Sequence, residues 1–183
     1  PGRRPGERAT PSPNAVADAT AAVRGAEDRA VADPAAWIPQ ETLALAYLDR
    51  AQLTGGYDDY AAADRALRLA VERAGKPGPC LAAARVHAAL HRLRPAAAAV
   101  AACNQSPMGA SQRAELEGIA ADVAFHEGRY ADALRGYRAA LQLGESVAGL
   151  APLSQYHART GAPVEAAALL DLAERIYHGT SAR

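Results

Sequence analysis

The chain repeats one pattern of apolar positions four times. In each copy a small residue is followed four residues later by a larger apolar one, and three residues after that by another small one. The copies are Ala63-x3-Leu67-x2-Ala70, Ala96-x3-Val100-x2-Cys103, Ala133-x3-Tyr137-x2-Ala140 and Ala166-x3-Leu170-x2-Ala173. This spacing places the three residues on one face of a helix. The first alanines lie 33, 37 and 33 residues apart, a period typical of solenoids built from helical hairpins, which bury their apolar faces by stacking.

The pattern predicts an N-terminal helix followed by four helical pairs. Asn14 is expected to cap a first helix over about residues 15–32, which Asp33 and Pro34 end. The four pairs are expected over residues 35–74, 78–107, 111–143 and 146–178. We expect the first pair to have the longest loop, from Thr54 to Asp58, with its second helix starting at Tyr60. Because no segment alternates β-branched and polar residues as a strand does, we predict an all-α fold.

Residues 1–13 are rich in proline and arginine and have no apolar periodicity. They are expected to form a flexible linker, so residues 14–183 make one helical repeat domain. A start at Pro1 fits either a cut in a longer chain or the mature end left after removal of an export signal.

Composition excludes two classes of protein. The chain has 20 basic and 20 acidic residues, and without a positive surplus it is not expected to bind nucleic acid. Its apolar runs fall short of the roughly 20 residues that span a bilayer, so no membrane insertion is expected. The 50% apolar share includes many alanines, which suits closely packed helices.

Several stretches carry a family resemblance. Leu43-Ala44-x2-Tyr47 matches the first-helix pattern of tetratricopeptide repeats, and residues 128–141, Gly-Arg-Tyr-Ala-Asp-Ala-Leu-Arg-Gly-Tyr-Arg-Ala-Ala-Leu, follow the turn and second helix. Looser matches begin at Leu153 and Ala83. The chain thus resembles a bacterial tetratricopeptide-repeat (TPR) protein over residues 35–178. The resemblance implies a right-handed α-solenoid of about four repeats, acting as a non-enzymatic scaffold that binds a protein or peptide partner.

Members of this family bind peptide or protein segments in a concave groove lined by the first helix of each pair. Matching helical phase gives the residues expected to face such a groove here. They are Glu41, Leu45, Leu48, Leu81, Arg85, Ala88, Glu115, Asp122, Phe125, His126, Gln155 and Arg159. The alternative is that the polar members are ordinary solvated side chains and the leucines pack against neighbours. Family members that clamp a terminal carboxylate use Lys and Asn on these faces, and this chain offers only the arginines.

Histidines support a competing hypothesis. His87 and His91 are four residues apart, a helical spacing that can bring two imidazoles to one metal ion. With His126 they would make the chain a small-ligand or metal-binding repeat protein. Against this, His87 occupies the packing position held by Tyr47 and His157 in other repeats. No phosphate loop, paired-carboxylate cleft or nucleophile elbow is visible, so we expect no catalytic residues and no cofactor.

The only cysteines, Cys80 and Cys103, are expected near opposing ends of one hairpin, where its two helices touch. A disulfide is geometrically plausible and would indicate an oxidising compartment. Two small buried thiols are the alternative, and spacing does not choose between them.

The last helix carries Leu169, Leu172 and Ile176 on the side where a further repeat would stack, a place where inner repeats have small residues such as Ala66 and Gly136. We therefore expect residues 164–178 to meet a second copy, a partner or a continuation of the chain. The long first loop and the linker resemble exported bacterial members of the family, which favours the cell envelope over the cytoplasm.

Overall fold

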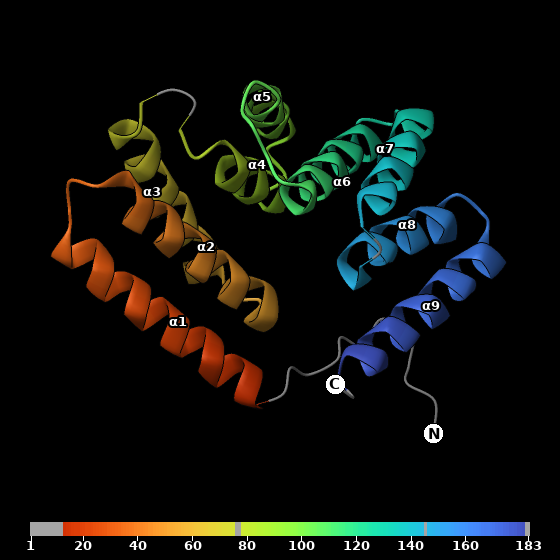
Figure 1. The fold of residues 1–183 in the computed structure, drawn as a ribbon, viewed down its shortest axis with the longest axis horizontal. Helices are drawn as coiled ribbons and strands as arrows, with labels where there is room; N and C mark the ends of the chain where they lie inside the picture. Colours follow the sequence, from red (N-terminus) through yellow and green to blue (C-terminus); the bar gives the residue numbers. More distant parts are fainter. Residues whose placement is uncertain (1–12, 76–77, 145, 182–183) are drawn as a thin grey trace. The chain divides into compact units, whose positions relative to one another are not determined.

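A computed structural model describes residues 13–75, 78–144 and 146–181, and all regular structure within them is helical (Figure 1). The predicted all-α class is therefore confirmed. None of the helices in this part of the chain combines the length and apolarity of a membrane-spanning segment. The sequence predicts one domain over residues 14–183, and the contacts of the described residues cluster into two compact units that divide between residues 82 and 83.

The first unit contains α1 (Pro13–Ala32), α2 (Trp37–Thr54) and α3 (Tyr57–Arg73), with α2 packed against both neighbours. Its core joins fully buried alanines, such as Ala44 and Ala63, with two leucines, Leu48 and Leu67. Small residues let helices approach closely, and the leucines fill the space that remains. The expected cap at Asn14 is wrong: α1 already begins at residue 13, because proline is favoured at the first position of a helix.

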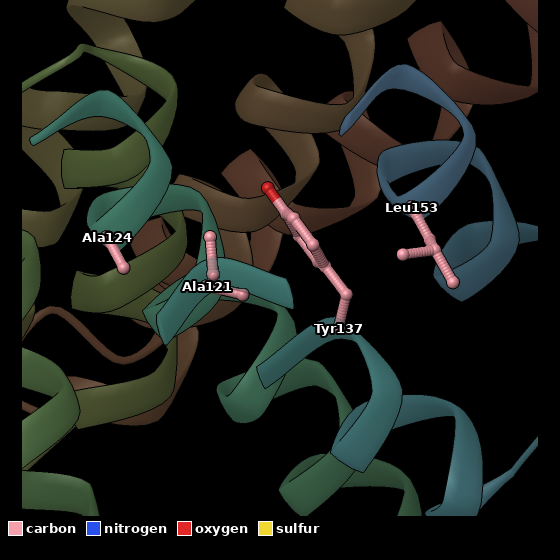
Figure 2. Close-up of a cluster of buried hydrophobic side chains, with 5 residues drawn as sticks. Ala121, Ala124, Tyr137 and Leu153 are labelled. Carbon is pink, nitrogen blue, oxygen red and sulfur yellow. The ribbon is translucent and has the colours of Figure 1, made fainter. Parts of the chain in front are cut away.

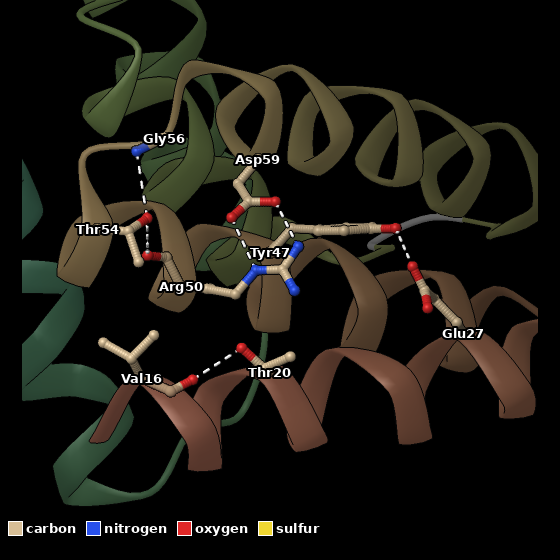
Figure 3. A network of polar contacts seen from close by, with 8 residues as sticks. All are labelled: Val16, Thr20, Glu27, Tyr47, Arg50, Thr54, Gly56 and Asp59. Atoms are coloured by element: carbon tan, nitrogen blue, oxygen red, sulfur yellow. Dashed lines mark hydrogen bonds and ion pairs between the residues drawn. The ribbon is translucent and has the colours of Figure 1, made fainter. Parts of the chain in front are cut away.

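The first interhelical loop is short, contrary to the expected length. Only Gly55 and Gly56 separate α2 from α3, and Gly55 adopts a φ of 74°. Tyr57 and Asp58, which were expected in the loop, form the first turn of α3 together with Asp59. The carboxylate of Asp59 accepts hydrogen bonds of 2.8 and 2.6 Å from Nε and Nη2 of Arg50 (Figure 3). Acidic side chains also favour the positive end of the helix dipole, which explains why the extra residues are helical.

The second unit is built from six helices in pairs. They are α4 (Cys80–Ala89), whose first turn crosses the boundary at residue 82, α5 (Leu93–Cys103), α6 (Ala110–His126), α7 (Tyr130–Leu143), α8 (Val147–Arg159) and α9 (Pro163–Ser181). The α6–α7 and α8–α9 pairs pack along their lengths, and α8 also touches α6 and α7. Tyr137 of α7 lies between Ala121 of α6 and Leu153 of α8, at the centre of a buried cluster (Figure 2).

One turn recurs three times in this unit, at residues 90–92, 127–129 and 160–162. Its middle residue has a positive φ each time: 53° at His91, 78° at Gly128 and 87° at Gly161. The amide of its third residue donates a 2.8 Å bond to the carbonyl five residues earlier. These bonds are Arg92 to His87, Arg129 to Ala124 and Ala162 to His157. The three pairs are thus equivalent in their turns, although their helices differ in length.

Both cysteines are disulfide-bonded, Cys80 at the first residue of α4 and Cys103 at the last residue of α5. Of the two alternatives left open by the sequence, the structure has the disulfide. Cys103 is completely buried. The helices α4 and α5 are short, with 10 and 11 residues, and a covalent link between them stabilises the fold by restricting the unfolded chain.

Replacing Ala133 with Leu is expected to lower the free energy of unfolding by about 1–3 kcal/mol, because the added carbons overpack a tight contact. Ala133 is completely buried. Close by, a Cβ added to Gly136 would lie 2.9 Å from the Cβ of Ala121, which shows how little space separates α6 and α7. Chemical denaturation followed by circular dichroism measures the loss. Ala131→Leu, at an exposed position of the same helix, is the control, and equal stability of the two variants would contradict this packing.

Replacing both Cys80 and Cys103 with Ser is expected to cost about 2–4 kcal/mol of stability. Before reduction, a thiol reagent should label neither cysteine in the denatured wild type. Reduction should lower the melting temperature of the wild type and leave that of the double variant unchanged. Two titratable thiols in protein isolated from its native compartment would refute the bond.

Candidate functional site

Aromatic side chains of α6, α7 and α8 gather around Phe125. Ring centroids lie 5.3 Å away for Tyr130, 5.9 Å for Tyr156 and 5.8 Å for His126, each edge to face. Such edge contacts are favourable beyond the area they bury. Phe125 is half-buried, whereas His126 is exposed and Tyr130 keeps 51% of its surface. Together with Arg159, these residues are called the Phe125 cluster.

The repeated turn positions this cluster. Phe125 and His126 end α6, and the turn at 127–129 reverses the chain so that Tyr130, the first residue of α7, meets Phe125. Tyr156 and Arg159 belong to the last turn of α8, which packs against α6. The ends of two equivalent first helices therefore contribute to one surface.

Arg159 adds a positive charge to the cluster. Its guanidinium carbon lies 5.8 Å from the centroid of the Phe125 ring, within the range of a cation–π contact. Among the residues that the structure describes, no carboxylate pairs with Arg159. Arg85, the other arginine expected in the groove, instead holds Glu115 at 3.0 Å. Arg159 can therefore meet an incoming anion without first losing an ion pair.

A hydrogen-bonded pair, the buried Tyr137 and the half-buried Asp122, adjoins the cluster. The Tyr137 hydroxyl donates a 2.7 Å bond to Asp122 Oδ1, and the Tyr137 ring is 6.1 Å from that of Tyr156. Burial raises the pKa of Asp122, although the bond from Tyr137 and the nearby His126 oppose this shift. Burial and the adjacent carboxylate raise the pKa of Tyr137. Tyr137 is only 4% exposed, so the ring that Tyr156 contacts belongs to the buried core.

The groove residues expected in the first unit differ in accessibility. Leu48 is 1% exposed and belongs to the core, so the expectation that it lines a binding surface is wrong. The alternative interpretation, in which the leucines are packed inside the fold, therefore holds for Leu48. Leu45 and Leu81 are half-buried. Glu41 is also half-buried, and burial raises its pKa.

In the second unit Phe125 contacts both His126 and Arg159, three of the residues that the sequence analysis assigned to the groove. Gln155 is exposed on α8. The sequence analysis missed Tyr130 and Tyr156 as members of the surface. Tyr156 lies five residues before its turn glycine, where the two equivalent helices have Val86 and Val123. The aromatic residue at a position that holds valine in the equivalent helices could therefore have identified Tyr156 from the sequence.

The helical histidine pair of the competing hypothesis does not form. α4 ends at Ala89, and His91 lies in the following turn with a positive φ. His87 and His91 are consequently not one turn apart on a continuous helix. In the described part of the chain, no group of three or more His, Cys, Asp or Glu side chains is placed to hold a metal ion.

The apolar stripe expected on the last helix is partly internal. Leu169 packs against the buried cluster around Tyr137, because α9 turns this side toward α8. Leu172 and Ile176 are half-buried, whereas Leu170 and Tyr177, on the other side of the buried Ala173, are 54% and 61% exposed. If α9 meets a second copy, Leu170 and Tyr177 offer more contact area than Leu169.

The pKa shift of Asp122 predicts a pH-dependent stability. The folded-state pKa lies above the usual 3.8, so this group stabilises the fold below that value, and the contribution is lost as pH rises through the folded pKa. Asp122→Asn keeps an acceptor for Tyr137 but carries no charge. Its stability relative to wild type should therefore increase between about pH 3 and pH 7. Asp171→Asn, at an exposed site of α9, is the control. A difference that is independent of pH would contradict the assignment.

Comparison of the chain with known proteins found no match. No protein-family model matches the chain. No curated protein and no solved structure matches it.

Proposed function

We propose that the chain is a non-enzymatic protein-interaction module whose helical pairs stack as TPR-like repeats. The three equivalent turns and the period of about 34 residues support the repeat interpretation. Helical repeats of this kind present the ends and faces of successive helices to a partner. The proposed binding surface is the Phe125 cluster, to which two equivalent helices contribute.

The observation that carries this proposal is an accessible set of aromatic rings beside Arg159, whose charge has no carboxylate partner among the described residues. Tyrosine and arginine are prominent among the residues that dominate binding energy at protein interfaces. Phenylalanine adds a large apolar area. The rings are also held in place, since Tyr137 supports Tyr156 and the short turn fixes Tyr130. Such preorganisation reduces the entropy lost when a partner binds.

The charges of the surface favour an acidic partner. Arg159 and the exposed His126 offer donors, whereas the carboxylate of Asp122 accepts a bond from Tyr137 and that of Glu127 is paired with Arg129. A protein segment that presents an apolar side chain to Phe125 and a carboxylate to Arg159 satisfies both features. Electrostatic complementarity of this kind contributes mainly to association rate and specificity.

A partner captured by the intact chain and identified by mass spectrometry should lose affinity when the cluster is altered. Phe125→Ala is expected to cost about 2 kcal/mol or more, roughly thirtyfold in Kd. Arg159→Ala should also weaken binding, with the larger effect at low salt. Calorimetry or surface plasmon resonance measures both.

Tyr57→Ala is the matched control, because Tyr57 is 88% exposed on the second helix of the first pair. It should bind like wild type. If Phe125→Ala and Arg159→Ala bind normally and Tyr57→Ala does not, the partner uses the second helices and the assigned surface is wrong.

A further inference from the structure

His91 occupies a backbone position that favours glycine. It is the middle residue of the recurring turn, where the other two copies have Gly128 and Gly161. A side chain with a Cβ is disfavoured in this left-handed conformation. Among the described residues, His91 is the only non-glycine residue with a positive φ. A strained residue of this kind directs attention to what its side chain does.

The His91 side chain meets a second histidine. Its ring centroid lies 5.1 Å from that of His126, and the two rings are perpendicular. The rings come from different elements of the second unit, the turn after α4 and the last residue of α6. Both side chains are exposed, so they are open to solvent ions and can rotate at little cost. The positions equivalent to His126 hold Ala89 and Arg159, and those equivalent to His91 hold glycine. The equivalent positions of the other two helical pairs therefore form no second pair of this kind.

We propose that His91 and His126 together bind one borderline divalent cation, Zn²⁺, Ni²⁺ or Cu²⁺, with water completing the coordination. Imidazole nitrogen is a preferred ligand of these ions, whereas Mg²⁺ and Ca²⁺ prefer oxygen. Two imidazoles on separate elements can reach one ion about 2.0–2.1 Å from each nitrogen after small rotations. The site takes two protein ligands, because the described part of the chain places no third His, Cys, Asp or Glu with them.

The neighbouring charges are compatible with a cation. Asp122, one turn before His126, is close enough for the two groups to influence each other electrostatically. Glu127, which follows His126, is held by Arg129 at 2.6 Å and is not needed as a ligand. A bound ion would fasten the turn after α4 to the end of α6, joining two successive helical pairs. It would also fix His126, which touches Phe125.

The competing explanation is that the two rings only pack against each other. Calorimetric titration distinguishes metal binding from packing alone. The untagged full chain is first stripped with a chelator, and then titrated with ZnCl₂ as the probe and with MgCl₂ as the negative control. The wild type should bind one Zn²⁺ per chain and melt at a higher temperature with Zn²⁺, while Mg²⁺ should do neither. His91→Gly installs the residue of the equivalent turns and should fold, and His126→Gln keeps a polar side chain. Each variant should lose at least tenfold in Zn²⁺ affinity, together with the melting shift.

His157→Gln, which removes another histidine of the same unit, is the matched control and should bind like wild type. A second measurement needs no variant: Zn²⁺ should protect His91 and His126 of the wild type from acylation by diethyl pyrocarbonate, as mapped by mass spectrometry, and leave His157 reactive. Absence of Zn²⁺ binding by the wild type, unchanged affinity in either variant, or equal acylation of His91 and His126 with and without Zn²⁺ would overturn the proposal.

Discussion

The close approach of α6 and α7 is the constraint on which the second unit depends. Gly136 lies so near α6 that an added Cβ would come within 2.9 Å of Ala121. Small residues on both helices permit this distance, and interior packing leaves no slack for larger ones. The same approach presents Tyr137 to Asp122 and, across the buried cluster, to Leu153 of α8. Tyr156 contacts Tyr137, and Phe125 contacts Tyr156. The candidate surface therefore depends on the small residues Ala121 and Gly136, which let α6 and α7 approach closely.

Each unit also contains a tyrosine whose hydroxyl donates to a carboxylate on a neighbouring helix. In the first unit Tyr47 donates to Glu27 of α1, and burial together with this bond raises the pKa of Tyr47 to about 12 (Figure 3). In the second unit Tyr137 donates to Asp122. A partly buried hydroxyl without an acceptor is costly, so both pairs fix the register of adjoining helices. Among the described residues, only the second pair adjoins the Phe125 cluster, through the contact of Tyr137 with Tyr156, and this difference directs the functional proposal to that unit.

The turns show how one backbone requirement can be met in several ways. Gly128 and Gly161 adopt a positive φ with no steric cost, whereas His91 adopts it although its Cβ disfavours this conformation. The first pair instead uses Gly55 in a shorter loop and adds a turn to α3. Because the two glycine turns have no comparable side chain, the imidazole of His91 is the feature that sets one turn apart from its equivalents.

The sequence by itself determined the all-helical class and the approximate helix limits, because apolar spacing reports which face of a local helix is buried. It also placed Phe125, His126 and Arg159 on one phase. It missed the start of α3 at Tyr57, since glycines and aspartates suit both loops and first turns. It did not choose between thiols and a disulfide for Cys80. Only the tertiary structure brought Tyr156 to Phe125, and His91 to His126, because those meetings depend on distances between helices, which periodicity along one chain does not encode.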